Sequence, residues 1–298
     1  MRRLAQSAVF VLVLGTATGC DLLDKLKSTT GPSPSSPGPP PANAPVRYTA
    51  IGASDATGVG SSAPCPPLTA CANGTGYVPL LARRMRDSQR EVTLVNVGIA
   101  EAVLSPAIQT IARQNGRNVP ANFVDHELPL VTSNSTLVTI FGGGNDTLAL
   151  VDAIEKGAGG ADIRGYVDTQ VRAFGADYER LVARVRQRAS GAFVMILNLP
   201  NMAGLPFSSG YSTQRRQLLQ AISAGFSREA NRRAGSGVVV VDLMCDAGIY
   251  DASKFSGDGF HPNDAGYAYI TDKLMPVVNG GPSSTAASCG QMTLVPGL

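Results

Sequence analysis

Three side chains in this 298-residue chain have the chemistry that nucleophilic catalysis requires. Ser54 stands in "TAIGASDATG" directly after a short apolar stretch, and Asp258 and His261 stand three residues apart in "DGFHP". A serine hydroxyl attacks poorly near neutral pH unless a base accepts its proton, and neutral histidine suits that task. A carboxylate on the other ring nitrogen fixes the tautomer of the histidine and stabilises its cation. The three residues are therefore candidates for nucleophile, base and orienting acid.

The chain has only two histidines, so His126 is the one other side chain of this type. It lies in "FVDHELP", a polar loop without a matching partner block. We expect His126 at the surface or in the wall of a crevice, which leaves His261 as the plausible base.

Two further stretches offer donors for an oxyanion. Acyl transfer places negative charge on the carbonyl oxygen, and hydrogen-bond donors must point to where that charge develops. Gly98 in "NVGIAEA" offers a backbone N–H, Asn145 in "GGGND" a side-chain amide, and Ser54 its own backbone N–H. Taken singly, Ser54 would suit a plain turn and Gly98 close packing. Asn145 and Asp146 would suit the start of a helix, and we expect Asp146 to cap it.

Alternating strand and helix patterns would position these residues. Apolar, β-branched runs predict strands at 47–51, 92–97, 137–141, 193–197 and 238–241. Helical patterns occupy 77–90, 105–113, 146–155, 165–188, 213–234 and a stretch after Pro262. This alternation predicts an α/β protein, a three-layer α/β/α sandwich around a mostly parallel five-stranded sheet. In such sheets the functional crevice lies beyond the carboxyl ends of the strands, where the candidate residues fall.

The four blocks, in this order, resemble those of the SGNH (GDSL) hydrolase family. The resemblance covers nearly the whole chain after residue 45 and implies a flavodoxin-like SGNH hydrolase fold. It implies Ser54 as nucleophile and oxyanion donor, Gly98 and Asn145 as further oxyanion donors, His261 as base and Asp258 as its orienter.

One position departs from the family pattern. The family usually has aspartate before the serine, and Ala53 stands there in this chain. Because that aspartate is not the acid of the triad, we expect the chemistry to survive. Asp55, directly after the serine, is our candidate to compensate for the missing hydrogen bonds.

The resemblance implies a serine esterase or acyl hydrolase that cleaves carboxylic esters through an acyl-enzyme and needs no cofactor. No tryptophan and 6% aromatic residues argue against a long sugar-stacking groove. We expect small acyl groups, on a small-molecule ester or an acylated glycan. Esterase, lipase, thioesterase and carbohydrate deacetylase activities remain open. The alternative from another class is a non-catalytic surface binding lipoprotein with an SGNH-like fold.

Other function classes lack their signals. Neither G-x-x-x-x-G-K-[ST] nor G-x-S-x-G occurs, which argues against a P-loop nucleotide site and an α/β-hydrolase nucleophile elbow. The formal net charge is +3 and the basic residues are scattered, so we expect no nucleic-acid partner. We expect a monomer.

The N-terminus predicts export. Two early arginines precede an apolar run at 8–14, and Ala17 to Cys20 resembles the lipobox of bacterial lipoproteins. The alternative is an ordinary secretory signal cut nearby. We expect a signal peptide at 1–19, a lipidated Cys20 that opens a Pro/Ser-rich tether to residue 45, and an SGNH hydrolase domain at 46–298. The protein would sit in the cell envelope, periplasmic or at the outer surface, with the lipid anchor as its only contact with a membrane.

Four cysteines remain beside Cys20, an even set that suits disulfides in an oxidising compartment. Three pairings are possible, and proximity favours Cys65 with Cys71, which leaves Cys245 with Cys289. Because the cysteine spacing lacks a two-residue knuckle, we expect no metal site.

Overall fold

A computed structural model describes residues 36–69 and 71–298, and its centre is a parallel five-stranded sheet. The strand order is β2-β1-β3-β4-β5, and every neighbouring pair is parallel. The strands are β1 (Val46–Gly52), β2 (Val92–Asn96), β3 (Leu137–Phe141), β4 (Phe193–Leu197) and β5 (Val238–Val241). The predicted fold class is confirmed. β1 is one residue longer at each end than predicted, and β2 is one residue shorter.

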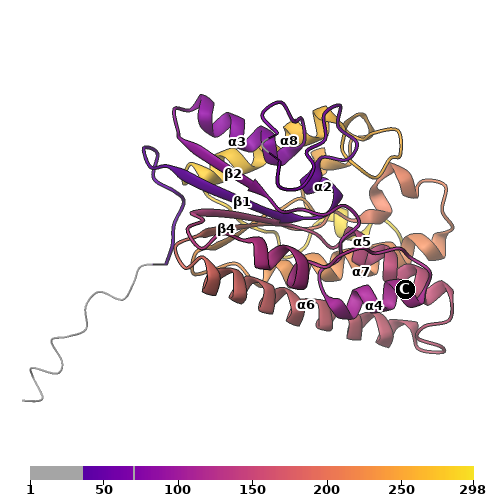
Figure 1. The fold of residues 1–298 in the computed structure, drawn as a ribbon. Helices are drawn as coiled ribbons and strands as arrows, with labels where there is room; N and C mark the ends of the chain where they lie inside the picture. The colour runs from indigo at the N-terminus through magenta and orange to yellow at the C-terminus, as the bar shows by residue number, and fades with distance from the viewer. Residues whose placement is uncertain (1–35, 70) are drawn as a thin grey trace, which may run out of the picture. The chain divides into compact units, whose positions relative to one another are not determined.

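Six longer helices cover the two faces of the sheet (Figure 1). One face carries α3 (Tyr77–Asp87) and α8 (Asp264–Val278). The other face carries α4 (Pro106–Gln114), α5 (Gly144–Glu155), α6 (Ile163–Arg188) and α7 (Thr213–Asn231). The predicted helix from 77 ends early because Gln89 adopts a left-handed backbone conformation with φ of 64°. Asn145 lies in the first turn of α5, which begins one residue before it.

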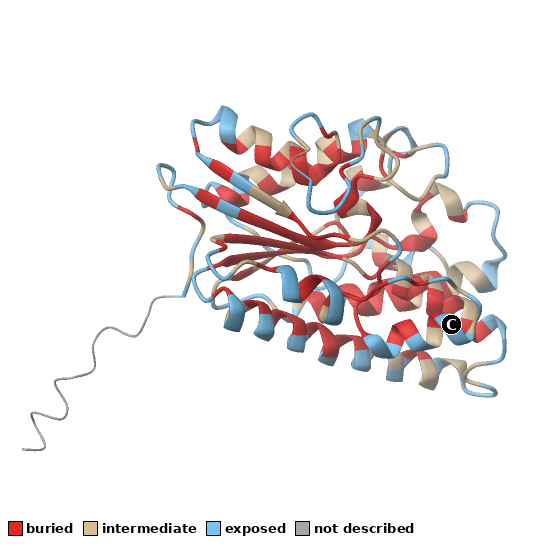
Figure 2. Ribbon diagram, in the orientation of Figure 1, coloured by how far each residue is buried: buried red, intermediate tan, exposed pale blue. Residues whose placement is uncertain are grey.

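The core lies in two apolar layers, one on each face of the sheet. Every residue of β3 and β4 is buried, as expected for strands covered on both faces (Figure 2). Along β1, Tyr48 and Ala50 pack with the α3 and α8 layer, whereas Ile51 packs with the other four helices. This alternation fixes the register of β1 and therefore the place where it ends.

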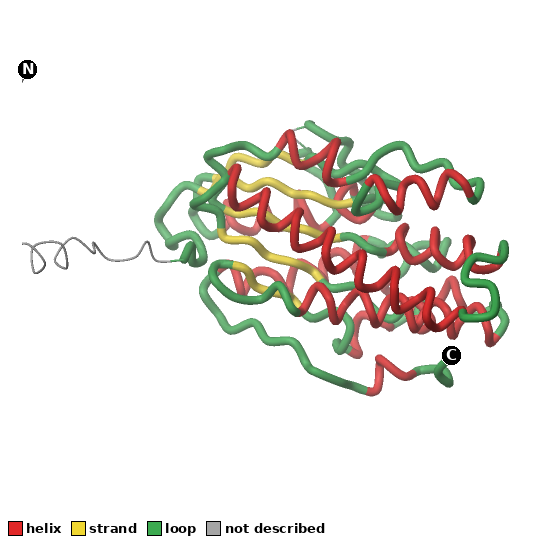
Figure 3. The backbone as a smooth tube through the Cα atoms, turned by 90° about the horizontal axis from the view of Figure 1, so that it is seen from below, coloured by secondary structure: helices red, strands yellow, loops and turns green. Residues whose placement is uncertain are grey.

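The two ends of the described chain pack on this sandwich. Pro37–Leu298 forms one compact unit, in which the Pro40 carbonyl accepts a hydrogen bond from Arg90. At the other end, the segment after α8 runs along the outside of the helices (Figure 3). There Gln291 accepts a hydrogen bond from Asn201 through its backbone carbonyl.

Both expected disulfides are present, Cys65–Cys71 and Cys245–Cys289. The second closes a span of 44 residues and ties the C-terminal segment to the loop after β5. The predicted signal peptide and Cys20 lie outside the described residues. Within residues 36–69 and 71–298, no helix has both the length and the apolar character needed to cross a membrane.

Candidate active site

Ser54 stands at the sharp turn that follows β1. It opens the one-turn helix α2 (Ser54–Thr57), which ends at Gly58 with a left-handed φ of 72°. Gly52 must be glycine, because a Cβ atom there would lie 2.7 Å from the backbone oxygen of Phe141 on β3. The turn is therefore packed tightly against the sheet, and Ser54 is only 6% exposed.

The structure brings Ser54, His261 and Asp258 together across 207 residues of sequence. Ser54 Oγ lies 2.8 Å from His261 Nε2, and His261 Nδ1 lies 2.6 Å from Asp258 Oδ2. Asp258 and His261 precede α8, and the backbone N–H of His261 donates to Asp258 Oδ1 at 2.9 Å. The Asp258 carboxylate therefore binds both the backbone and the ring of His261.

The environment of Asp258 keeps it ionised. Burial would raise the pKa of Asp258, but hydrogen bonds from His261, Phe260 and Ser256 hold this pKa well below its usual range. Because an ionised carboxylate only accepts hydrogen bonds, neutral His261 carries its proton on Nδ1. His261 Nε2 is then free to accept the hydroxyl proton of Ser54.

These residues open onto a groove of about 560 Å³ that Ser54, His261, Asn145 and Glu101 help to line. Asn145 Nδ2 donates one hydrogen bond to the backbone oxygen of Ala102 at 3.0 Å, which orients the amide and leaves its second N–H available. The groove thus brings together the Ser54 hydroxyl, the His261 imidazole and the Asn145 amide, with Ser54 and Asn145 beyond the carboxyl ends of β1 and β3.

Gly98 does not line this groove. Its backbone N–H donates to Asn96 Oδ1 at 3.1 Å. A Cβ atom on Gly98 would lie 2.6 Å from the Cβ of Ala56, so glycine is needed here for packing against α2. Glu101, three residues further along this loop, does line the groove, and its backbone has a left-handed φ of 64°. Among the described residues, neither the Glu101 nor the Ser54 backbone N–H has an acceptor.

Asp146 does not cap α5, contrary to our expectation. Its carboxylate reaches across to accept the backbone N–H of Leu104 at 2.9 Å. Burial raises the pKa of Asp146 to about 7, against the effect of that hydrogen bond. Asp146 therefore ties α5, which carries Asn145, to the loop on the far side of the groove.

His126 is exposed, as expected, and does not line the groove. Its Nδ1 accepts the backbone N–H of Asn122 at 3.2 Å. The next residue, Glu127, is fully buried, and its carboxyl group accepts the backbone N–H of Gly52 at 2.8 Å and of Ile99 at 3.2 Å. Burial raises the pKa of Glu127 well above its usual range, against both hydrogen bonds.

Glu127 was not selected from the sequence, where it stands in the polar stretch "FVDHELP" directly before the apolar "LPL". Asp55 lines a different space, a small cavity. Burial raises the pKa of Asp55, and nearby His261 lowers it. One hydrogen bond to this turn, from the Gly52 N–H, is accepted by Glu127.

The small cavity holds about 40 Å³ and lies behind Phe260. Its walls are mostly apolar and include Leu199, Met202 and Leu205. Phe260 lines both this cavity and the groove, and its ring packs edge-on against the His261 ring at 4.7 Å. The Phe260 side chain therefore separates an apolar space from the reacting atoms.

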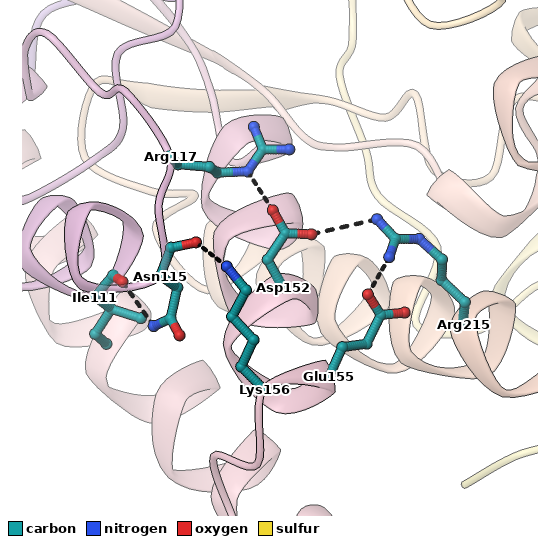
Figure 4. A network of polar contacts seen from close by, with 7 residues as sticks. All are labelled: Ile111, Asn115, Arg117, Asp152, Glu155, Lys156 and Arg215. Carbon is teal, nitrogen blue, oxygen red and sulfur yellow. Dashed lines mark hydrogen bonds and ion pairs between the residues drawn. The ribbon is translucent and has the colours of Figure 1, made fainter.

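Arg117 adds positive charge to the wall of the groove. Its Nε donates to Asp152 Oδ2 at 2.7 Å, and Asp152 is held in turn by Arg215, which also pairs with Glu155 (Figure 4). The two Nη atoms of Arg117 point away from Asp152 (Figure 4). The ion pairs thus fix the guanidinium while its outer edge stays available. In the part of the chain that the structure describes, no group of three or more metal-ligating side chains gathers.

A family model described as the GDSL-like Lipase/Acylhydrolase family matches residues 50–269. A GDSL lipase of Mycobacterium tuberculosis is 42% identical over 45 residues, which cover 15% of this chain and 20% of that protein. The match to this curated relative therefore spans about a fifth of its length.

Solved structures share the fold at low sequence identity. A lipase from a goat rumen metagenome has a TM-score of 0.55 and 22% identity, over 79% of this chain and 98% of that one. An extracellular lipase from Streptomyces rimosus has a TM-score of 0.53 and 18% identity, over 78% of this chain and 99% of that one. An acetylxylan esterase from Geobacillus stearothermophilus has a TM-score of 0.51 and 13% identity, over 83% of this chain and 99% of that one. Since the family model matches most of the sequence, the chain belongs to the GDSL-like lipase/acylhydrolase family.

Proposed function

We propose that this protein cleaves carboxylic esters through an acyl-enzyme formed on Ser54. The observation that carries the proposal is the hydrogen-bond chain from Ser54 through His261 to Asp258, with links of 2.8 and 2.6 Å. A nucleophile and its base must lie within this reach, and the base must be oriented by a third group. The chain also opens onto a groove in which an ester can bind.

In the first half of the reaction, Ser54 Oγ attacks the ester carbonyl carbon while His261 Nε2 accepts the hydroxyl proton. Asp258 stabilises the imidazolium that results. The tetrahedral intermediate collapses when its bond to the alcohol oxygen breaks, and His261 gives its proton to that oxygen. In the second half, His261 takes a proton from water, the hydroxide attacks the acyl-enzyme, and the proton returns to Ser54 as the acid leaves.

We assign three donors to the oxyanion. Ser54 supplies its backbone N–H and Asn145 its free amide N–H, as the sequence led us to expect. For the third donor we propose the backbone N–H of Glu101 in place of Gly98. This choice is supported by the position of Glu101 on the groove and by the hydrogen bond that already occupies Gly98.

We propose acetyl or similarly small acyl groups on a glycan as the substrate. The groove carries Glu101, Arg117 and Asn118, polar side chains that suit an alcohol part rich in hydroxyl groups. Phe260 separates the groove from the apolar cavity that a longer acyl chain would need. This choice agrees with the Geobacillus protein of like fold, which is named an acetylxylan esterase.

We further propose export and lipid anchoring at Cys20, with the protein acting as a monomer. Export is supported by the two disulfides and by the extracellular lipase of like fold. Acyl chains on Cys20 would contribute about 0.8 kcal/mol per buried methylene and hold the chain at a membrane. The intact mass of membrane-extracted protein tests this, because an unmodified N-terminus would contradict it.

The test of the activity uses full-length protein in detergent with p-nitrophenyl esters and acetylated xylan oligomers. Ser54→Ala or His261→Ala should lower kcat by several orders of magnitude. Asn145→Ala should lower it by about 10²- to 10³-fold. Ser190→Ala is the matched control, because it removes an exposed serine hydroxyl that lies outside the groove, and it should leave kcat unchanged.

The competing function is that of a non-catalytic binding lipoprotein. It predicts that acetylated oligomers bind without turnover and that Ser54→Ala binds them as the wild type does. Equal turnover by wild type and Ser54→Ala would remove the assignment of the nucleophile.

A further inference from the structure

We infer that Glu127 is a positioning residue, which holds together the loops that present the nucleophile and the oxyanion donors. The inference rests on the proposed esterase function. Glu127 itself lies outside the groove and acts through backbone groups that it binds.

The two oxygens of one carboxyl group bridge two neighbouring strand ends. Oε2 accepts the N–H of Gly52, 75 residues away in sequence, and Oε1 accepts the N–H of Ile99, 28 residues away. Gly52 precedes Ser54 by two residues, and Ile99 precedes Glu101 by two residues. The carboxyl group therefore clamps the start of both loops that flank the reacting carbonyl.

A third strand end is braced by the same segment. Phe123 packs directly against Gly142, where a Cβ atom would overlap the ring, and Gly142 leads into the α5 turn with Asn145. The segment itself is fixed, since Asn122 Oδ1 accepts the backbone N–H of Asp125 at 2.8 Å. Residues 122–127 thus contact the ends of β1 and β3 and the loop that follows β2.

The burial of the Glu127 carboxyl group is itself unfavourable, so its contacts must offset the loss of water. Removing a carboxyl group from water is unfavourable unless it is hydrogen-bonded, and the N–H groups of Gly52 and Ile99 are the partners that oppose the rise in the pKa of Glu127 on burial. A glutamine fits this site less well, because the amide has one acceptor oxygen and its NH₂ group would face a second N–H donor. The Ile99 N–H also donates to the backbone oxygen of Gly52 at 3.0 Å, so the carboxyl group reinforces a direct bond between the two strand ends.

Glu127 supplies an acceptor to the serine turn from a distant loop. The methyl side chain of Ala53 accepts no hydrogen bond, and Asp55 lines the small cavity. The Gly52 N–H, two residues before Ser54, is bound by the Glu127 carboxyl group. The serine turn of this chain therefore depends on residues 122–127 for its geometry.

The test compares Glu127→Gln and Glu127→Asp with Glu229→Gln, in full-length protein with p-nitrophenyl acetate. Glu229 is a matched control, a buried glutamate on α7 that pairs with Arg232 and lies away from the groove. Displacing reacting groups by about 1 Å costs roughly 10²-fold in rate. We expect kcat per folded molecule to fall about 10- to 100-fold in Glu127→Gln and less in Glu127→Asp, with KM within about threefold of wild type.

A second readout separates positioning from folding. Labelling of Ser54 by a fluorophosphonate should slow in parallel with kcat, whereas Glu229→Gln should lose stability and keep both rates. The folded fraction of each variant is measured by circular dichroism at the assay temperature. Wild-type kcat and labelling rate per folded molecule in both Glu127 variants would overturn the inference. An inactive wild type would instead count against the esterase function.

Discussion

The tip of the Phe260 ring lies 3.3 Å from the point that a Cβ atom would occupy on Gly144. Phe260 directly precedes His261, and Gly144 directly precedes Asn145, so this contact joins two sides of the groove. Because Gly144 has no side chain, the Phe260 ring can pack directly against its backbone. With the ring there, the apolar cavity of about 40 Å³ stays separate from the groove.

Phe260→Ala should shift the selectivity of the enzyme toward longer acyl chains. Joining the cavity to the groove gives an octanoyl chain apolar surface to bury, and each well-buried methylene changes specificity by about 1–3 kcal/mol. We expect the ratio of kcat/KM for p-nitrophenyl octanoate to that for acetate to rise about tenfold or more. Tyr211→Ala is the control, because Tyr211 contacts Phe207 and lines neither space. An unchanged ratio in Phe260→Ala would contradict the role of the ring.

Substitutions at Glu101 should report on its backbone and not on its carboxylate. Glu101→Gly suits a φ of 64° and should keep kcat while raising the free energy of unfolding by about 1 kcal/mol. Glu101→Val should lower kcat at least tenfold, because a β-branched residue resists positive φ and would move the N–H. Steady-state kinetics and urea unfolding measure both effects. Loss of activity in Glu101→Gly would show that the carboxylate is needed.

Asp146 should make the folded protein less stable as pH rises from about 4 to 7. Its pKa is about 7 in the folded state against an ordinary value of 3.8, so within this window the folded state holds a proton that the unfolded state releases. Stability is then greatest below the ordinary pKa and falls until the pH passes the folded value. Asp146→Asn should reduce this loss by a few kcal/mol. Urea unfolding at pH 4.5 and 7.5 provides the comparison, and equal slopes in both proteins would count against the raised pKa.

Opening the Cys245–Cys289 disulfide should loosen the C-terminal segment. The bond closes 44 residues, and crosslinks of this span stabilise the folded state by about 2–4 kcal/mol. Cys289→Ser, made together with Cys245→Ser to avoid a free thiol, should lower the free energy of unfolding by that amount. The Cys65–Cys71 disulfide closes a span of only six residues, so replacing both of these cysteines by serine should lower the free energy of unfolding by less. A larger loss from the shorter loop would point to a different role for Cys65–Cys71.

The sheet was predictable because its signal is local. Each strand is a short apolar run bounded by polar or glycine residues, and three of the five have the predicted bounds. The parallel order then placed Ser54 and Asn145 at one edge of the sheet, and the DxxH spacing brought His261 and Asp258 into one turn. The spacing and the topology were sufficient to select these four residues.

The groups that position and border the site were not predictable, because their roles arise from contacts between segments that are distant in sequence. Gly98 looked like a donor in sequence, but its N–H turns to Asn96 and the positive φ falls on Glu101, a residue type that rarely adopts it. Glu127 and Phe260 occupy ordinary sequence contexts. Only the packing of their loops shows what the carboxyl group binds and which spaces the ring divides.

Pro37 and Pro40, at the start of the described chain, both pack at one end of the sheet. Pro37 lies against Gly237, just before β5, and Pro40 binds Arg90, just before β2, so both contacts lie at the amino ends of strands. Ser54 lies at the opposite end of β1, a strand of seven residues, roughly 20 Å away. The groove and the first described residues therefore lie at opposite ends of the sheet, so an ester can reach Ser54 without passing the segment around Pro37 and Pro40.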